Sequence, residues 1–281
     1  MKIDLHTHSY FSDGAHSPRF VVERARTNGV QQLALTDHDC LDGYLTAKQL
    51  ALPDAPILIP GVEISTLWDK LEIHVLGLCI DPDHEGLGAL LACQQQRRRE
   101  RLAAINIKLL KAGISGLEQY MSELPSRAPG RAHVAGFLAK NSAARTGKKA
   151  IRMLTRNGRF FVNPQWCSMA DAVQEIRLAG GIAVLAHPHR YSLTNGRIRK
   201  LLEEFCTVGG EGIEVCCSNM TPIQIAQLTS MSQDFQLWVS AGSDFHSSAA
   251  TWMDIGRIAP VPEAAISKAI WTHPRWQFKQ Q

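Results

Sequence analysis

Ile3-Asp4-Leu5-His6-Thr7-His8 is a short, largely apolar run that ends in two histidines. Such a run at the start of a chain predicts a buried β-strand. Side chains alternate between the two faces of a strand, so His6 and His8 point the same way and suit two ligands of one metal ion. The same spacing returns near the other end of the chain at Asp244 and His246.

Further apolar, β-branched runs follow, and helix-like segments lie between most of them. One helix is expected to begin at Ser17-Pro18, a capping residue followed by proline, and to end at Asn28-Gly29. Strands separated by helices of ~10 to 15 residues indicate βα units and a mainly parallel sheet or barrel. The predicted strands are residues 3–8, 32–38, 57–65, 71–78, 181–188, 212–216 and 237–243.

Residues 87–162 break this alternation, because they are mostly helix-like and strongly basic. Between Arg97 and Arg159 the chain has 15 of its 30 Lys and Arg but 3 of its 26 Asp and Glu, so this segment carries +12 and the remainder −8. Such asymmetry indicates parts with different electrostatic roles. We predict a barrel domain built from residues 1–86 and 163–281, with a basic helical subdomain inserted at residues 87–162.

Composition places the chain among cytoplasmic globular proteins. Of its 281 residues, 45% are hydrophobic and 20% charged, which is ordinary for a packed core. The chain opens without an export leader, and no run approaches the ~18 to 20 apolar residues of a membrane span. The seven cysteines are an odd number without a C-x-x-C spacing, which favours reduced, buried thiols. No obligate protein partner is evident from the sequence.

Residues able to bind metal ions recur where the predicted strands end. A single histidine at such a place is more often a hydrogen-bonded structural residue than a ligand. Several strand ends carrying ligand-type residues make that explanation weaker, because these ends meet at one rim of the fold and buried ionisable groups are costly unless paired or metal-bound. The residues at the strand ends are His6, His8, Asp37, His38, Glu63, His74, His187, Asp244 and His246.

The donor types in this set are imidazole and carboxylate, without a thiolate. Such donors suit Mn²⁺, Zn²⁺ or Fe²⁺ better than an all-oxygen Ca²⁺ site or a thiolate-rich structural zinc site. We therefore expect two or three divalent metal ions as cofactors, most readily Mn²⁺, with Zn²⁺, Fe²⁺ or Mg²⁺ as alternatives.

The order of these motifs resembles that of the PHP (polymerase and histidinol phosphatase) family across nearly the whole chain. H-x-H alone is shared with amidohydrolases, but their typical bridging lysine has no candidate at Glu63. Two shorter motifs, Gly130-Arg131-Ala132-His133 and Pro164-Gln165-Trp166, resemble the branch that contains 3′,5′-nucleoside bisphosphate phosphatase and the 5′-3′ exoribonuclease called ribonuclease AM. The family motifs occupy residues 4–9 with 12–14, 35–39, 61–65, 72–77, 186–188 and 242–246.

The resemblance implies a fold of the α/β class, a distorted (β/α)7 barrel, with a trinuclear metal site. One metal would be held by His6, His8, Glu63 and Asp244. Glu63 would bridge to a second metal held by His74 and His187. The third would be held by Asp13, His38 and His246.

The branch resemblance also implies residues that act on the substrate. Arg131 and His133, at the start of a helix in the basic segment, would reach over the metals and hold phosphate. Arg190 and His189 would join the substrate site; His189 stands where relatives commonly have glycine in the motif A-H-P-G-R. The catalytic residues implied are Glu63, His187, Asp244, Arg131 and His133.

The resulting expectation is a metal-dependent phosphoesterase that acts on nucleotides, including nucleoside 3′,5′-bisphosphates, or on RNA as a 5′-3′ exoribonuclease. Clustered divalent ions activate water and hold the attacking and leaving oxygens of a phosphoester. A histidinol-phosphatase type of enzyme is one alternative, although it leaves the basic segment without a role. A non-catalytic nucleic-acid-binding module is another alternative. Such modules typically lack some metal ligands, whereas every ligand position of the family has a matching residue here.

Overall fold

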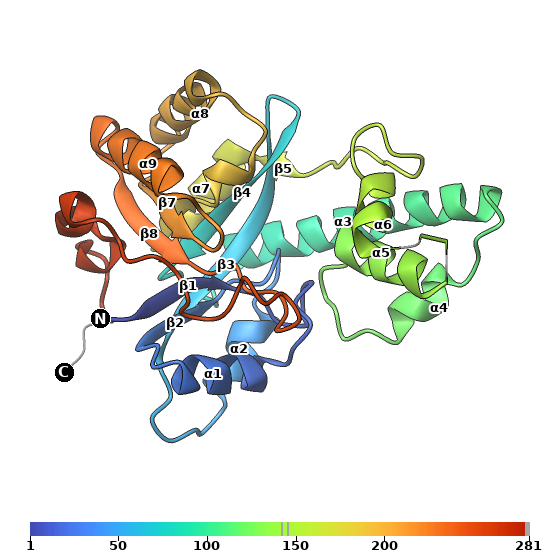
Figure 1. The fold of residues 1–281 in the computed structure, drawn as a ribbon, viewed down its shortest axis with the longest axis horizontal. Coiled ribbons are helices and arrows are strands. Elements are labelled where there is room, and N and C mark those ends of the chain that lie inside the picture. Colours follow the sequence, from blue (N-terminus) through green and yellow to red (C-terminus); the bar gives the residue numbers. More distant parts are fainter. Residues whose placement is uncertain (142, 145, 279–281) are drawn as a thin grey trace.

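The protein is an almost closed barrel of strands with helices on its outside, as the computed structural model shows (Figure 1). The structure describes residues 1–141, 143–144 and 146–278. The strands lie in the order β1-β2-β3-β4-β6-β7-β8, and β5 pairs with β3 off this path. The predicted barrel-like α/β fold is therefore confirmed. The strands are β1 (Ile3–Thr7), β2 (Gln32–Leu35), β3 (Ile57–Trp68), β4 (Leu71–Leu78), β5 (Cys167–Ser168), β6 (Ile182–Leu185), β7 (Gly212–Cys217) and β8 (Trp238–Gly242).

The first and last strands lie against each other and nearly close the barrel. The His8 N–H donates to the Phe245 carbonyl at 2.9 Å, and the Asp244 N–H donates to the His6 carbonyl at 2.8 Å. These bonds set the two ends of the chain side by side at the rim. The H-x-H pair and the Asp244–His246 pair, more than 230 residues apart in sequence, are thereby brought to one place.

The hairpin of β3 and β4 departs from the predicted parallel arrangement. β4 runs antiparallel to both β3 and β6, with Ser65 opposite His74. β3 continues to Trp68, and the chain reverses at Asp69 and Lys70, whose φ angles of 47° and 63° are left-handed. Placing Glu63 and His74 at strand ends was therefore wrong, because both lie inside long strands that extend past the rim of the barrel.

The helices around the barrel begin where the sequence offers capping side chains. Ser17 accepts a hydrogen bond from the Phe20 N–H at the start of α1, and Ser168 accepts one from the Asp171 N–H at the start of α7. These helices cover the outside of the sheet (Figure 1). They are α1 (Pro18–Thr27), α2 (Asp42–Lys48), α7 (Met169–Leu178), α8 (Asn195–Thr207) and α9 (Pro222–Asp234), with short 3₁₀ turns at Pro188–Arg190, Glu263–Lys268 and Ile270–Thr272.

Four helices between β4 and β5 form a group beside the barrel (Figure 1). The first of them, α3 (Glu85–Lys111), spans about 40 Å and reaches from the barrel into the group. The others are α4 (Leu117–Ser122), α5 (Arg131–Lys140) and α6 (Gly147–Leu154). Leu109, Phe137 and Phe160 belong to a buried apolar cluster of this group, distinct from the barrel core. The group therefore has its own packing, while α3 ties it to the barrel.

None of the helices in the described part of the chain is long and apolar enough to cross a membrane.

Candidate metal centre

The rim of the barrel brings all nine predicted metal ligands into one site. His6 lies on β1 and His8 just after it, His38 follows β2, and Asp13 comes from the loop after β1. Glu63 and His74 face each other from the β3–β4 hairpin. His187 follows β6, and Asp244 and His246 follow β8. Segments far apart in sequence thus converge, as the motif order predicts.

Glu63 lies at the centre of the site, with its side chain 1% exposed. Its Oε2 atom lies 2.9 to 3.3 Å from nitrogens of three histidines, and its Oε1 atom lies 2.8 to 2.9 Å from nitrogens of two more. Two carboxylate oxygens facing separate sets of imidazoles are the arrangement needed to bridge two cations. The histidines on Oε2 are His6, His8 and His38, and those on Oε1 are His74 and His187.

Donor atoms within 4.8 Å of one another form three groups that could each hold a metal ion. His6, His8, Glu63 and Asp244 form one group, with the same members as the set predicted for the first metal. A second group contains Asp13, His38 and His246, the set predicted for the third metal, and also His8. The remaining group joins His38 and His74 to Glu63, whereas His187 lies outside it, against the same Glu63 oxygen as His74.

Several buried polar atoms of this site have no hydrogen-bond partner among the described residues. A buried polar atom left without a partner costs about 1 to 3 kcal/mol. These atoms point at one another around the same small volume, so divalent cations would satisfy them together. The residues present therefore fit the predicted metals. The atoms are His6 Nε2, His8 Nε2, Asp13 Oδ1, His38 Nδ1 and Glu63 Oε2.

The charges of the site favour ionised carboxylates, but its imidazoles differ, because burial lowers the pKa of His38 and of His187. Burial alone would raise the pKa of Glu63, but His38, His6 and His74 hold it well below its usual range. Burial would likewise lower the pKa of His74, yet Glu63 and Glu72 raise it to about 9. Protons and metal ions thus compete for the same imidazole nitrogens, and metal binding weakens as the pH falls.

Two buried carboxylates on the loop after β2 have structural roles. Asp37, which stands among the ligand-type residues of the sequence, accepts hydrogen bonds from the Ser9 N–H, the Ser9 hydroxyl and the Ser12 hydroxyl at 2.6 to 2.7 Å. It thereby shapes the loop that carries Asp13. Asp39, with a left-handed φ of 48°, accepts a hydrogen bond from the Ser65 N–H at 2.9 Å. Neither belongs to the three donor groups.

Arg98 of α3 is a buried side chain of the basic run and contacts the barrel directly. Its Nε donates to Asp39 Oδ2 at 2.7 Å, and its Nη2 donates to the Ser65 hydroxyl at 2.7 Å. The guanidinium also lies 5.0 Å from the centre of the Trp166 ring. Arg98 therefore holds the long helix against the strand that carries Glu63. The sequence did not indicate this role, because Arg98 lies in a run of arginines that looks like a solvent-exposed charged face.

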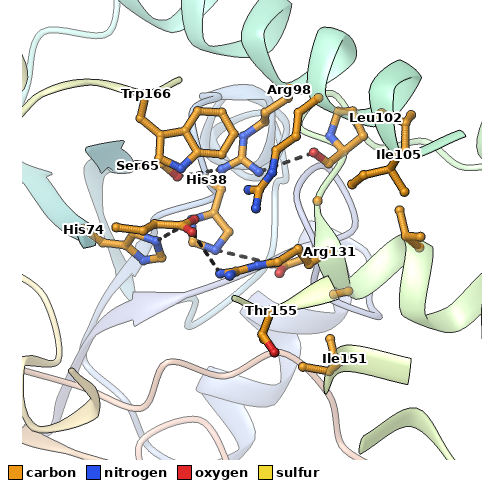
Figure 2. A pocket seen from close by; sticks show the side chains of 17 residues that line it. His38, Ser65, His74, Arg98, Leu102, Ile105, Arg131, Ile151, Thr155 and Trp166 are labelled. Atoms are coloured by element: carbon orange, nitrogen blue, oxygen red, sulfur yellow. Dashed lines mark hydrogen bonds and ion pairs between the residues drawn. The ribbon is translucent and has the colours of Figure 1, made fainter. Parts of the chain in front are cut away.

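A cavity of about 260 Å³ opens between the candidate metal ligands and the helical group (Figure 2). Asp13, His38 and His74 line its metal side, and Arg98, Arg101 and Arg131 line it from the helices. Leu102, Ile105, Val134, Ile151 and Trp166 give it an apolar wall. Cationic and apolar surfaces beside a candidate metal centre are what a nucleotide needs, since it has phosphate at one end and an aromatic base at the other.

The arginines of this cavity differ in their partners. The Arg131 Nη2 atom lies 3.3 Å from Glu72 Oε2, so its charge is shared with a carboxylate (Figure 2). Arg101 donates from Nε to the Val162 carbonyl at 3.1 Å, and its buried Nη2 has no partner among the described residues. Burial lowers the pKa of Arg101 to about 10, which leaves it charged at neutral pH. The sequence did not single out Arg101 within its basic run.

The other predicted substrate residues occupy separate places. His133 accepts a hydrogen bond from the Gly130 N–H at 3.0 Å and so helps to begin α5; it is absent from the lining of the cavity. Arg190 donates from Nη1 to Asp244 Oδ2 and lies beside the metal centre. Burial, together with the charge of Arg190, lowers the pKa of His189 to about 4, so this imidazole is neutral at pH 7.

Comparison with known proteins shows the family to which the chain belongs. The family model of the PHP domain matches residues 4–157, more than half of the chain and including six of the nine candidate ligands. The chain belongs to the PHP family. This PHP protein is 38% identical over 266 residues to a 5′-3′ exoribonuclease of Haemophilus influenzae, with 94% of this chain and 97% of that protein covered.

A curated protein and a solved structure, both from Chromobacterium violaceum, extend the comparison. A 3′,5′-nucleoside bisphosphate phosphatase is 35% identical to this PHP protein, with 96% of this chain and 95% of that protein covered. A solved structure described as an amidohydrolase, with bound sulfate and no metal, has a TM-score of 0.89 and 34% identity, with 97% and 95% covered. The likeness therefore reaches past the family match, over the segments that carry His187, Asp244 and His246.

Proposed function

We propose that this PHP-family hydrolase is a metal-dependent phosphoesterase of nucleotides. It would remove phosphate from nucleoside 3′,5′-bisphosphates and release 5′ nucleotides from short RNA. One observation carries the proposal: a carboxylate shared by five imidazoles, Glu63, lies beside a cavity that three arginines line. The exoribonuclease and phosphatase activities named for its relatives support the same substrate class.

The proposed metals are two or three divalent ions, most readily Mn²⁺. The donors assigned to them are His6, His8, Asp13, His38, Glu63, His74, His187, Asp244 and His246, and imidazole with carboxylate suits such ions. When bound, the metals would activate water and neutralise charge on the phosphoryl oxygens. A cytoplasmic location goes with this proposal and agrees with seven cysteines that are all free thiols.

The chain's own residues would bind and orient the substrate. Arg101, with an N–H free to donate, and Arg131, held at the start of α5, would grip a phosphate away from the metals. Trp166 and Leu102 give an apolar surface to the base in the same cavity. Arg190 would hold Asp244 in place through their ion pair. His133 would support the helix start, and His189 would border the site as a neutral group.

A substrate panel tests the proposal. Purified protein with Mn²⁺ is offered 3′,5′-bisphosphoadenosine, AMP, histidinol phosphate and short 5′-phosphorylated RNAs, and the released phosphate and nucleotides are measured. We expect turnover of the bisphosphate and of RNA to exceed that of histidinol phosphate. Exclusive turnover of histidinol phosphate would support the small-molecule phosphatase instead. No turnover of any substrate, with metal bound, would support a nucleic-acid-binding module without activity.

A second basic surface of the protein, on and after α6, could bind RNA that extends beyond one nucleotide. Lys148, Lys149 and Arg152 of α6, together with Arg159 beyond its end, are called the α6 face; they line a shallow hollow with Thr146, Met153 and Gly158. Among the described residues, none of the four pairs with a carboxylate. The neighbouring residues Ile151 and Thr155 line the 260 Å³ cavity that Arg98, Arg101 and Arg131 also line. We propose that the predicted insertion at 87–162 thus offers a nucleic-acid backbone a path out of the cavity.

Removing charge from the α6 face is expected to affect RNA alone. The variant Lys148→Gln/Lys149→Gln/Arg152→Gln should keep wild-type turnover of the bisphosphate. Its turnover of RNA at low salt should fall, and the slope of log activity against log salt should flatten by about 2, given about 0.7 per lost phosphate contact. The control is Arg197→Gln/Arg199→Gln/Lys200→Gln on α8, which removes the same number of positive charges where each one pairs with a carboxylate. An equal loss of RNA turnover in both variants would contradict a specific path.

A further inference from the structure

Glu214 is a fully buried carboxylate on β7 that lies behind the candidate metal ligands. It belongs to none of the three donor groups. Its Oε1 atom accepts from His6 Nδ1 at 3.1 Å, and its Oε2 atom accepts from the His187 N–H at 2.8 Å. One side chain therefore contacts two candidate ligands that come from different strands.

The contact with His6 fixes which ring nitrogen faces the metals. A carboxylate at Nδ1 keeps the proton on that nitrogen and leaves the Nε2 lone pair free. His6 Nε2 lies 3.3 Å from Glu63 Oε2 and 3.2 Å from Asp244 Oδ1, so it points into the donor group. Glu214 thus orients the imidazole from behind and increases its basicity.

The contact with His187 holds a strained backbone. His187 has a φ of 30°, in the left-handed region that residues other than glycine rarely adopt. Its N–H bond to Glu214 helps to hold this conformation, which turns the imidazole toward Glu63 Oε1 at 2.8 Å. The strain is thereby coupled to the placement of a candidate ligand.

The surroundings leave little freedom to the Glu214 carboxylate. Gly242 of β8 lies against His6, and a Cβ atom at this position would overlap the His6 side chain and come within 3.0 Å of Glu214 Oε1. Bulk at position 242 would therefore displace the pair. The absence of a side chain at Gly242 leaves room for the Glu214 carboxylate between its two donors, His6 and His187.

We propose that Glu214 is a positioning residue that sets the metal affinity of the site by orienting His6 and His187. This inference rests on the proposed metal binding. Glutamine at this position keeps the shape but loses the negative charge, and its NH₂ group replaces one of the two oxygens that accept from His6 and His187. The amide NH₂ would then face one of these donors, and one candidate ligand would lose its support.

The test measures Mn²⁺ binding apart from turnover. Wild type, Glu214→Gln and the control Glu211→Gln are stripped of metal and titrated with Mn²⁺ by calorimetry and by thermal shift; Glu211 directly precedes β7 and pairs with His273 and Arg275. We expect Glu214→Gln to fold and to need about 10- to 100-fold more Mn²⁺ for half-saturation, while the control binds as wild type. Activity should return when Mn²⁺ is raised by the same factor.

Wild-type affinity in Glu214→Gln would overturn the inference, as would an equal loss in Glu211→Gln. Failure of wild type to bind Mn²⁺ would instead reject the proposed metal site. Should the variant not fold, nuclear magnetic resonance of ¹⁵N-histidine-labelled wild type with Zn²⁺ decides. We expect His6 to keep its proton on Nδ1 and to bind through Nε2; binding through Nδ1 would exclude the role of Glu214.

Discussion

Replacing Glu63 with glutamine is expected to lower kcat/KM for the bisphosphate by at least about 1000-fold, equivalent to about 4 kcal/mol of transition-state stabilisation. The reason is that both oxygens of this carboxylate face candidate metal ligands, three histidines on one side and two on the other. Glutamine keeps the volume but removes the negative charge that would balance the proposed cations. Elemental analysis of the dialysed variant should show less than the wild-type content of metal.

The control for this substitution is Asp69→Asn, which removes a carboxylate from the exposed turn of the same hairpin. It should keep wild-type metal content and activity. Full turnover by metal-free Glu63→Gln protein would exclude the mechanism, since no other carboxylate in the described structure faces both sets of histidines.

Asp244→Asn is expected to have an effect of similar size for a different reason. Asp244 has a φ of 53°, and asparagine tolerates this left-handed backbone as well as aspartate does. The backbone is therefore kept, while the oxygen that lies 3.2 Å from His6 Nε2 and 3.0 Å from His8 Nε2 loses its charge. We expect kcat/KM to fall by about 1000-fold, or about 4 kcal/mol.

The matched control is Asp54→Asn, because Asp54 has the same φ of 53° and lies exposed in a loop away from the site. Circular dichroism should be unchanged in both variants, and the metal content should fall in Asp244→Asn alone. Retention of full metal content and activity by Asp244→Asn would show that this carboxylate is not a ligand.

The local features of the fold could be predicted from the sequence. Apolar runs gave the seven strands of the barrel path, and the i, i+2 spacing of His6 and His8 placed both imidazoles on one face. β5 was missed, because two residues show no periodicity. The positions of Glu63 and His74 along their strands were wrong, because the reversal at Asp69 and Lys70 depends on left-handed backbone rather than on an apolar pattern.

The support of the site could not be predicted, because it depends on pairs of residues far apart in sequence. Glu214 and His6 are separated by 208 residues, and Arg98 and Asp39 by 59. A glutamate inside an apolar strand and an arginine inside a basic run look ordinary until the fold brings their partners to them. Spacing therefore identifies candidate ligands but not the residues that hold them.

The nine candidate ligands all lie outside α3 to α6, whereas Arg98, Arg101 and Arg131 lie within those helices. On the proposed function, chemistry and recognition would thus be encoded in different stretches of the chain. We therefore expect substitutions that line the cavity from α5 and α6 to alter which ester is accepted while the candidate ligands stay in place. Retargeting the enzyme to a new phosphoester is therefore best attempted by varying these helices, with Arg98 retained because it holds α3 to the barrel.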